Sequence, residues 1–243
     1  MKNICISGCG NIGRMHAKNL KGRARLYFHS RSTASARALC DRMAGTGVFE
    51  EFEQVLASDA IDAIVLATPP QFHRSQTIAA LRSGKAVLVE KPLCTSAAEL
   101  TEIETALNEQ EGALLMVAEN YYYKPSVSLL KALIADDAVG AIERVEVQKL
   151  FRQSSTGWRT NYGSLLEGGI HFVALIGDVV DDVLADLSAS FPGRRSDSEP
   201  ERHCELQLTY RGGTSARLRY AWDVPSFTKG LLQHSKIIGA AGR

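Results

Sequence analysis

The amino-acid sequence predicts an α/β protein in which a doubly wound parallel sheet is followed by a second domain of the α+β type. Over residues 1–120, short apolar runs alternate with helical patterns, as strands and helices do in a doubly wound sheet. Beyond residue 120, longer strands with alternating polar and apolar residues favour a large open sheet that is mostly antiparallel. We therefore expect one domain at residues 1–120 and a second at residues 121–243.

Composition and charge narrow the class of protein. The chain has 243 residues, 45% hydrophobic and 23% charged, which is the balance of a globular protein with a large core. A formal net charge of +1 gives no support to a nucleic-acid or acidic-membrane partner, and no apolar run approaches the ~18 residues that span a bilayer. The five cysteines lack metal-ligand spacing, so we expect reduced thiols, no metal site and a cytoplasmic protein without a signal peptide.

The first strand, at residues 4–7, leads into a glycine-rich turn and then a helix at residues 14–20. The turn has the spacing G-x-G-x-x-G, and a strand before it with a helix after it is the context in which this motif binds a dinucleotide. The three glycines permit a tight turn, a close approach of the backbone to a pyrophosphate, and helix packing on the strand. A plain glycine turn is the alternative. The candidate cofactor-binding residues here are Gly8, Gly10, Asn11, Ile12 and Gly13.

The second strand, at residues 25–28, ends in a segment that indicates which cofactor is bound. An NAD site usually has Asp or Glu here to bind the ribose 2′-hydroxyl, and this segment has neither. Ser30 and Arg31 instead offer a hydroxyl and a bidentate cation, which suit a 2′-phosphate. We therefore expect NADP, with NAD as the alternative if Arg31 is only a solvated residue before the next helix.

A strand at residues 60–67 ends in a proline-rich turn, Thr68, Pro69 and Pro70, where the ribose or nicotinamide of a cofactor would lie. His73 opens the following helix and is a further candidate for cofactor binding, although a capping or packing role fits it as well. The elements expected between the two strand ends are a helix at residues 33–44, a strand at 48–49 and a helix at 51–56.

The strand at residues 86–89 ends in Glu90, Lys91 and Pro92. Charged side chains at the carboxyl end of a parallel strand lie at the crevice where open α/β sheets bind ligands, so Glu90 and Lys91 are also candidates for cofactor binding. Pro92 stops the strand and stiffens the backbone at Lys91. A surface Lys–Glu pair is the alternative. A helix at residues 96–108 and a strand at 114–118 complete the first domain.

The second half contains one further motif, Glu167-x-x-x-His171, at the start of a helix that runs to about residue 176. On a helix these residues are i and i+4 and point the same way, so the carboxylate could orient the imidazole. An ordinary helix ion pair is the alternative. Other expected elements are a helix at residues 126–134, strands at 142–150, 185–190, 205–210, 217–222 and 236–238, and a hairpin turn at Gly212 and Gly213.

Taken together, the glycine turn, Glu90-Lys91-Pro92 and Glu167-x-x-x-His171 resemble the glucose-fructose oxidoreductase, inositol dehydrogenase and MocA (GFO/IDH/MocA) family. The resemblance implies a Rossmann domain, a second domain whose open sheet commonly forms homo-oligomers, and hydride exchange between NAD(P) and a carbinol carbon of a sugar or polyol. It implies that His171 is the general acid/base, that Lys91 polarises the reacting oxygen, and that Glu167 orients His171 or binds a substrate hydroxyl. Position alone makes Asn120, Tyr123, Trp158 and Arg159 candidates for substrate binding.

Other relatives of this family leave two alternative functions open, a dinucleotide-binding regulator without turnover and an NAD-dependent glycoside hydrolase. The sequence also departs from the family pattern. Glu167 stands where Asp is usual, and Ala174 stands where a second Asp is often found. Family members usually continue well beyond the last strand found here, so we expect a chain truncated at its C-terminus.

Overall fold

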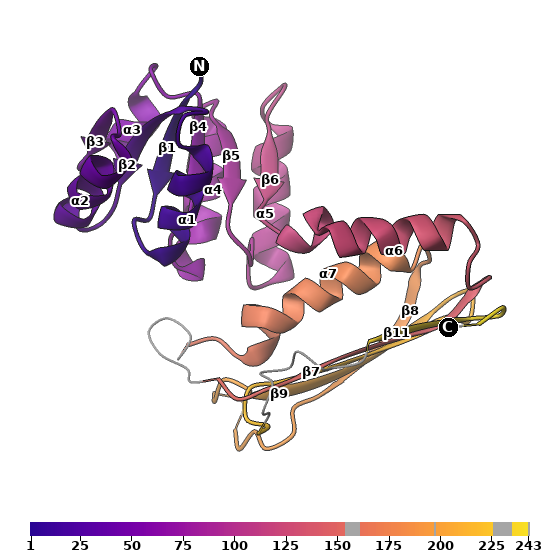
Figure 1. The fold of residues 1–243 in the computed structure, drawn as a ribbon. Helices are drawn as coiled ribbons and strands as arrows, with labels where there is room; N and C mark the ends of the chain where they lie inside the picture. Colours follow the sequence, from indigo (N-terminus) through magenta and orange to yellow (C-terminus); the bar gives the residue numbers. More distant parts are fainter. Residues whose placement is uncertain (154–160, 197, 226–234, 243) are drawn as a thin grey trace. The chain divides into compact units, whose positions relative to one another are not determined.

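In the computed structural model, which describes residues 1–153, 161–196, 198–225 and 235–242, six parallel strands form the sheet of the first of two units, Met1–Ala118. Their order is β3-β2-β1-β4-β5-β6 (Figure 1). This is the order of a Rossmann fold, in which the chain reverses its direction of winding between β1 and β4. The strands are β1 (Asn3–Ser7), β2 (Arg25–His29), β3 (Gly47–Phe49), β4 (Ala63–Leu66), β5 (Ala86–Val89) and β6 (Leu115–Val117).

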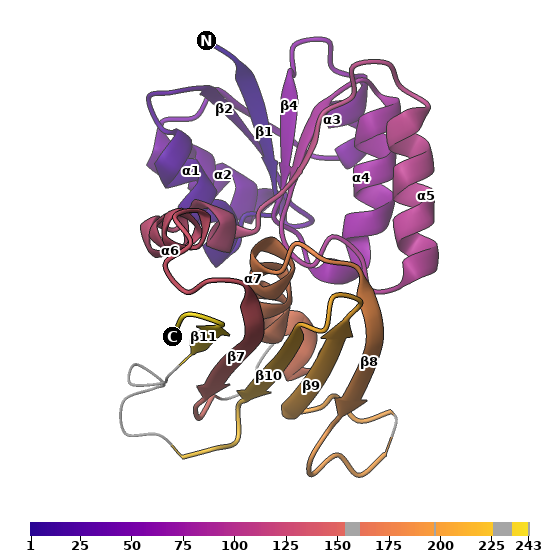
Figure 2. The same ribbon diagram turned by 90° about the vertical axis from the view of Figure 1, so that its right-hand side faces the viewer.

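Helices cover both faces of this sheet, as Figure 2 shows. Successive strand residues point to opposite faces, so Cys5 and Ile6 on β1 belong to different apolar clusters, and so do Ile64 and Val65 on β4. One cluster includes residues of α1 and α2, and the other includes residues of α3, α4 and α5. The helices are α1 (Asn11–Leu20), α2 (Thr33–Met43), α3 (Phe52–Ala57), α4 (His73–Arg82) and α5 (Ala97–Asn108).

Two boundaries in this unit differ from the expectation by three residues, and the others differ by less. Helix α1 begins at Asn11 rather than at Arg14, because the helix starts inside the glycine turn, with Gly10 as its N-cap. Strand β4 begins at Ala63 rather than at Ala60, and its parallel pairing with β1 starts at Ile4↔Ala63.

The second unit, Glu119–Arg243, contains a five-stranded sheet in the order β11-β7-β10-β9-β8. Strands β7 and β10 pair in parallel, and the other three neighbouring pairs are antiparallel. The predicted α/β fold, with a parallel sheet followed by a mostly antiparallel one, is therefore confirmed. The strands are β7 (Ile142–Leu150), β8 (Leu184–Ser190), β9 (His203–Tyr210), β10 (Ser215–Ala221) and β11 (Lys236–Gly239).

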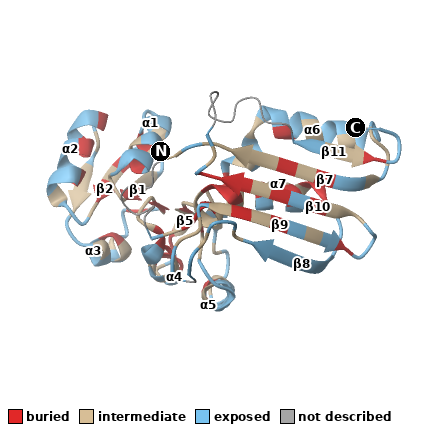
Figure 3. Ribbon diagram, turned by 90° about the horizontal axis from the view of Figure 1, so that it is seen from below, coloured by how far each residue is buried: buried red, intermediate tan, exposed pale blue. Residues whose placement is uncertain are grey.

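Helix α7 (Ile170–Val179) packs on this sheet, and α6 (Pro125–Ala135) contributes to the same core. Phe172 and Ile176 of α7 join Val147 of β7, Leu218 of β10 and Trp222 in one apolar cluster. Burial is uneven across the sheet, since β10 is largely buried whereas every residue of the edge strand β8 is exposed (Figure 3). No helix in the described ranges is both long enough and apolar enough to span a bilayer.

Candidate functional sites in the two units

The glycine turn after β1 is as tight as its sequence predicts. Gly8 has φ +103°, and a Cβ atom added to it would lie 2.4 Å from the carbonyl oxygen of Ala67, beyond the end of β4. A Cβ added to Gly13 would lie 1.8 Å from the carbonyl oxygen of Gly8. Gly10 has open space around the corresponding position. Two glycines therefore close the turn, and the third leaves room for a ligand beside the backbone.

The start of α1 suits an anion. Its N-cap, Gly10, offers no side-chain cap, and the first turn has no acidic residue. The unpaired backbone N–H groups and the positive end of the helix dipole together favour a phosphate at such a position. The glycine turn and this helix start therefore fit the pyrophosphate of a dinucleotide.

The segment after β2 exposes Arg31 next to the half-buried Ser30. The following residue, Ser32, is used structurally, because its hydroxyl caps α2 by accepting a hydrogen bond from the backbone N–H of Ser35. At the end of β2, His29 is buried, with Nδ1 2.8 Å from the hydroxyl of Ser7. Burial lowers the pKa of His29, and the charges of Glu51 and Glu53 oppose that shift. Ser30 and Arg31 remain the candidate contacts to a 2′-phosphate.

The turn after β4 is bound by α4. The hydroxyl of Thr68 donates to Gln76 Oε1 at 2.6 Å, and the carbonyl oxygen of Thr68 lies 2.7 Å from Nε2 of His73. The other ring nitrogen of His73 lies 2.7 Å from the carbonyl oxygen of Pro92, and the residue is buried. Protein carbonyls thus occupy both ring nitrogens, so the geometry corresponds to the packing role and leaves neither nitrogen for a cofactor.

The segment after β5 brings Glu90 to α1. Oε1 of Glu90 lies 2.7 Å from Nε2 of His16, and both side chains are about four-fifths buried, with exposed fractions of 18% and 19%. Lys91 is half-buried and Pro92 is buried. Residues on both sides of Lys91 are therefore held by side chains from helices.

In the second unit, His171 is paired with Glu119. Nδ1 of His171 lies 2.7 Å from both carboxylate oxygens, and the backbone N–H of Tyr121 donates to Oε1 of the same carboxylate at 2.9 Å. Only 6% of the Glu119 side chain and 18% of the His171 side chain are exposed. A carboxylate on Nδ1 fixes the tautomer and the ring orientation, which leaves Nε2 for proton transfer.

Aromatic contacts also hold the ring of His171. The ring of Tyr121 is stacked on it, with centroids 5.0 Å apart and planes 17° apart. Nζ of Lys124 lies 3.2 Å from the centroid of the Tyr121 ring, a cation–π contact. Burial, together with the charge of Glu119, raises the pKa of Tyr121, and burial with the charge of Lys149 lowers the pKa of Lys124.

Helix α7 is preceded by a π-helical turn, Leu165–Gly169, which contains Glu167. A Cβ added to Gly168 would lie 2.0 Å from the hydroxyl oxygen of Tyr220 on β10, so only glycine allows this close approach. Since the π-turn has i→i+5 hydrogen bonds, the i, i+4 geometry expected for Glu167 and His171 is not that of a regular α-helix. The carboxylate on Nδ1 of His171 comes from Glu119 rather than from Glu167.

Of the four other residues expected to bind substrate, the structure describes two. Asn120 and Tyr123 lie on the 3-10 turn Asn120–Tyr123, and both are exposed. Tyr121 on the same turn is the tyrosine that contacts His171. Trp158 and Arg159 lie outside the described residues. Sequence reasoning missed Glu119 and Tyr121, although an acid directly after the strand at residues 114–118 repeats the pattern of Glu90 after β5 and could have indicated Glu119.

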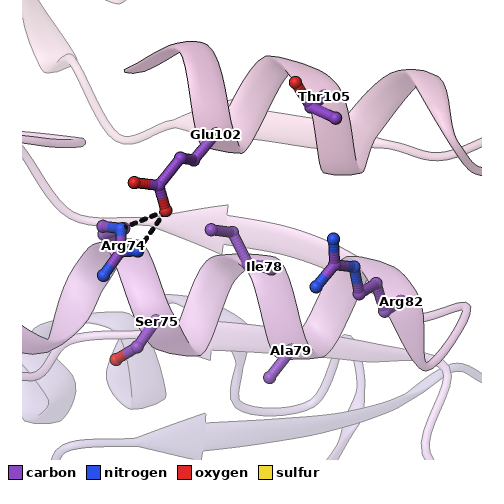
Figure 4. Close-up of a pocket in the computed structure, with 7 residues that line it drawn as sticks. All are labelled: Arg74, Ser75, Ile78, Ala79, Arg82, Glu102 and Thr105. Atoms are coloured by element: carbon purple, nitrogen blue, oxygen red, sulfur yellow. Dashed lines mark hydrogen bonds and ion pairs between the residues drawn. The ribbon is translucent and has the colours of Figure 1, made fainter. Parts of the chain in front are cut away.

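A surface groove lies between α4 and α5 (Figure 4). Arg74 points toward Glu102 and forms an ion pair with it, and Arg82 binds Glu109 at 3.0 Å. Glu102 of α5 and Glu109, the residue directly after α5, therefore already pair with both arginines, and these ion pairs link the two helices.

Among the described residues, no group of His, Cys, Asp and Glu could hold a metal ion. The five cysteines form no disulfide. Burial raises the pKa of the Cys9 thiol, in the glycine turn, to about 11, which disfavours the thiolate form.

Comparison with known proteins places both units in one family. The family model for the oxidoreductase family with an NAD-binding Rossmann fold matches residues 2–119. The model for the GFO/IDH/MocA C-terminal domain matches residues 127–243.

Individual relatives agree with these matches. An inositol 2-dehydrogenase of Rubrobacter xylanophilus is 34% identical over 65% of this chain and 44% of its own length. A glucose-6-phosphate 3-dehydrogenase of Bacillus subtilis is 27% identical over 72% of this chain and 53% of its own length. The chain thus spans about half the length of these relatives. The fold matches that of a scyllo-inositol dehydrogenase from Lactobacillus casei solved with NAD(H) and scyllo-inositol, with a TM-score of 0.84, 19% identity, and coverage of 100% of this chain and 75% of that one.

Proposed function

The chain belongs to the GFO/IDH/MocA family of oxidoreductases, and on this premise we propose that it is an NAD(P)-dependent dehydrogenase of sugar-like or polyol substrates. The observation that supports the proposal most directly is the pair of Glu119 and His171. A binding module without turnover does not need an imidazole whose tautomer is fixed by a buried carboxylate. The names of the relatives, which include an inositol and a sugar-phosphate dehydrogenase, support the substrate class.

His171 is the general acid/base in this proposal. With its Nδ1–H donated to Glu119, the ring has a lone pair on Nε2 that can accept the proton of a substrate hydroxyl. In the reductive direction the same nitrogen returns that proton. The negative charge of Glu119 interacts favourably with the ring while it holds the proton.

Lys91 and Glu167 have supporting roles. Lys91 donates a hydrogen bond to the reacting oxygen and stabilises the negative charge that develops on it. Glu167 binds a second substrate hydroxyl. We assign Asn120, Tyr123, Trp158 and Arg159 to the substrate-binding surface, as the sequence predicts.

The first unit holds the cofactor. The glycine turn and the start of α1 bind its pyrophosphate, and the turn Thr68, Pro69 and Pro70 contacts its ribose or nicotinamide. Ser30 and Arg31 bind the 2′-phosphate, so NADP is preferred over NAD. A bound nicotinamide supplies the hydride acceptor or donor.

A direct spectrophotometric assay tests the proposed reaction. Purified protein is mixed with NADP⁺ or NAD⁺ and a panel of inositols, aldoses and sugar phosphates, and reduced cofactor is followed by absorbance. We expect turnover of at least one compound, and we expect Lys91→Ala and His171→Ala each to lower kcat by about 100-fold or more with little change in cofactor affinity. Cofactor binding without any turnover would contradict the proposal and indicate a regulator. Hydrolysis of a glycoside with no net change in cofactor would indicate the hydrolase.

We further propose that the protein forms a homo-oligomer through its second sheet. Val183, Leu184 and Leu187 are each about half exposed at or beside the edge strand β8. An exposed strand edge with apolar side chains favours pairing with another chain. Sedimentation should show a larger species than the monomer, and Leu187→Glu should shift it toward the monomer. The unpaired cysteines fit a cytoplasmic setting, which cell fractionation would test.

A further inference from the structure

Two histidines from different helices bind the residues on either side of Lys91. His16, on α1, has Nε2 2.7 Å from Oε1 of Glu90. His73, the first residue of α4, has Nδ1 2.7 Å from the carbonyl oxygen of Pro92. Lys91 therefore lies between a residue held through its side chain and a residue held through its backbone.

The contact of His73 is the more buried of the two. The residue has an exposed fraction of 1%, and Nε2 of its ring lies 2.7 Å from the carbonyl oxygen of Thr68. Carbonyl oxygens only accept hydrogen bonds, so the doubly protonated ring makes both bonds and the neutral ring makes one of them. With Nδ1–H donated to the carbonyl oxygen of Pro92, the ring ties the segment after β5 to α4, and its other nitrogen lies against the segment after β4, at the carboxyl ends of two adjacent strands.

The contact of His16 adds a second, less buried constraint. The carboxylate of Glu90 accepts a hydrogen bond from a helix that starts in the glycine turn, and the two side chains are about four-fifths buried. Within the first unit, α1 and α4 thus fix the segment at residues 90–92 from two directions. A segment held in this way gives a lysine at its centre few backbone conformations.

We propose that His16 and His73 are positioning residues that fix the backbone on both sides of Lys91 and so place its ammonium group for the reaction. The inference rests on the proposed catalytic role of Lys91. Displacement of a catalytic group by about 1 Å can lower a rate about 100-fold. Loss of the His73 contacts should therefore affect turnover more than cofactor affinity, whereas a residue that only stabilises the fold would affect both in proportion to the unfolded fraction.

Variants that each keep one hydrogen bond provide the test. Asn places its amide nitrogen near the position of Nδ1, and Gln places it near that of Nε2. His73→Asn therefore keeps the bond to Pro92, His73→Gln keeps the bond to Thr68, and His73→Phe keeps neither. We expect kcat to fall about 10- to 100-fold in the Phe variant. The Asn variant should retain more of the wild-type kcat than the Gln variant. Cofactor affinity should stay within about threefold of the wild-type value in all three. For His16 the order is reversed, because its bond to Glu90 is made through Nε2, so His16→Gln should retain more activity than His16→Asn.

A second measurement does not depend on turnover. Amide hydrogen exchange at Lys91 and Leu93 should be faster in His73→Phe than in His73→Asn. Arg82→Ala is the matched control on α4, because it removes only an exposed ion pair with Glu109 and should change neither exchange at residues 90–93 nor kcat. Equal exchange in the Phe and Asn variants would overturn the inference. If Lys91→Ala lowers kcat but the His73 variants do not, the positioning role is wrong; if Lys91→Ala has no effect, the proposed function itself is wrong.

Discussion

The two units build their candidate sites from different parts of the chain. In the first unit the site is mainly backbone: two glycines that close the turn at Gly8 and Gly13, the open position at Gly10, and the uncapped start of α1. In the second unit it consists of side chains, with Glu119 and Tyr121 holding the ring of His171. A backbone site binds the charged part of a cofactor that many proteins share. A side-chain site can provide an acid/base and a particular substrate contact.

The side-chain site should be the more sensitive to a single change. Glu119→Gln keeps the shape of the side chain but removes the charge that holds Nδ1–H of His171, so the ring loses its fixed tautomer and the stabilisation of its protonated form. We expect kcat to fall by about 100- to 10,000-fold, with cofactor affinity nearly unchanged. Steady-state kinetics with saturating cofactor would measure the fall.

Glu167→Gln is the matched control, because it makes the same chemical change at the acid that the sequence indicated. Glu167→Gln should mainly raise the KM for substrate, because Nδ1 of His171 is bound by Glu119 and not by Glu167. A loss of kcat in Glu167→Gln as large as that in Glu119→Gln would contradict this division between the two acids.

The difference between the units also explains how much could be predicted from the sequence. The glycine turn is local: its geometry is encoded in residues 8–13 and in the strand and helix that flank it. The strand ends that carry Ser30, Thr68 and Lys91 follow from the alternation of strands and helices. The family motifs added His171 and Lys91, and the family is confirmed.

The contacts around His171 could not be predicted in the same way. Glu119 and His171 are 52 positions apart, and only the tertiary fold brings them together. The π-turn that contains Glu167 also brings Gly168 close to Tyr220, a residue of β10. Periodicity treats residues 165–176 as one regular helix and cannot show that contact.

Arg31 gives a second test of this difference between the units, because it is a side chain in a site that is mainly backbone. Arg31→Ala should weaken NADPH binding about 10- to 100-fold, the range of a charged hydrogen bond, and should leave NADH within about a factor of two. Fluorescence titration of each cofactor would measure the loss. Arg37→Ala is a suitable control, since Arg37 is an exposed arginine on the following helix that pairs with Glu50. Equal weakening of both cofactors would mean that Arg31 does not bind the 2′-phosphate.

The smallest expected effect concerns His29, which contrasts with His171 in its partner. The ring of His171 is bound to a carboxylate, whereas that of His29 is bound to the hydroxyl of Ser7 and is buried. Burial lowers the pKa of His29 in the folded protein below its ordinary value of 6.5. Below about pH 6.5, the unfolded chain protonates His29 more readily than the folded protein does. The contribution of His29 to the free energy of unfolding is therefore fully present above this pH, and it is lost as the pH falls through the pKa of the folded state.

The slope cannot exceed that of one proton, about 1.4 kcal/mol per pH unit. Hydrogen exchange of the amides of β1 and β2, corrected for the intrinsic effect of pH, would report it within the first unit alone. His29→Asn should remove this part of the pH dependence, and His203→Asn, a substitution in the second unit, should leave it unchanged. If the pH dependence of the free energy of unfolding is the same in His29→Asn as in the wild type, another group must bind the proton. The burial of neutral His29 beside Ser7 would then not determine the stability of this unit in acid.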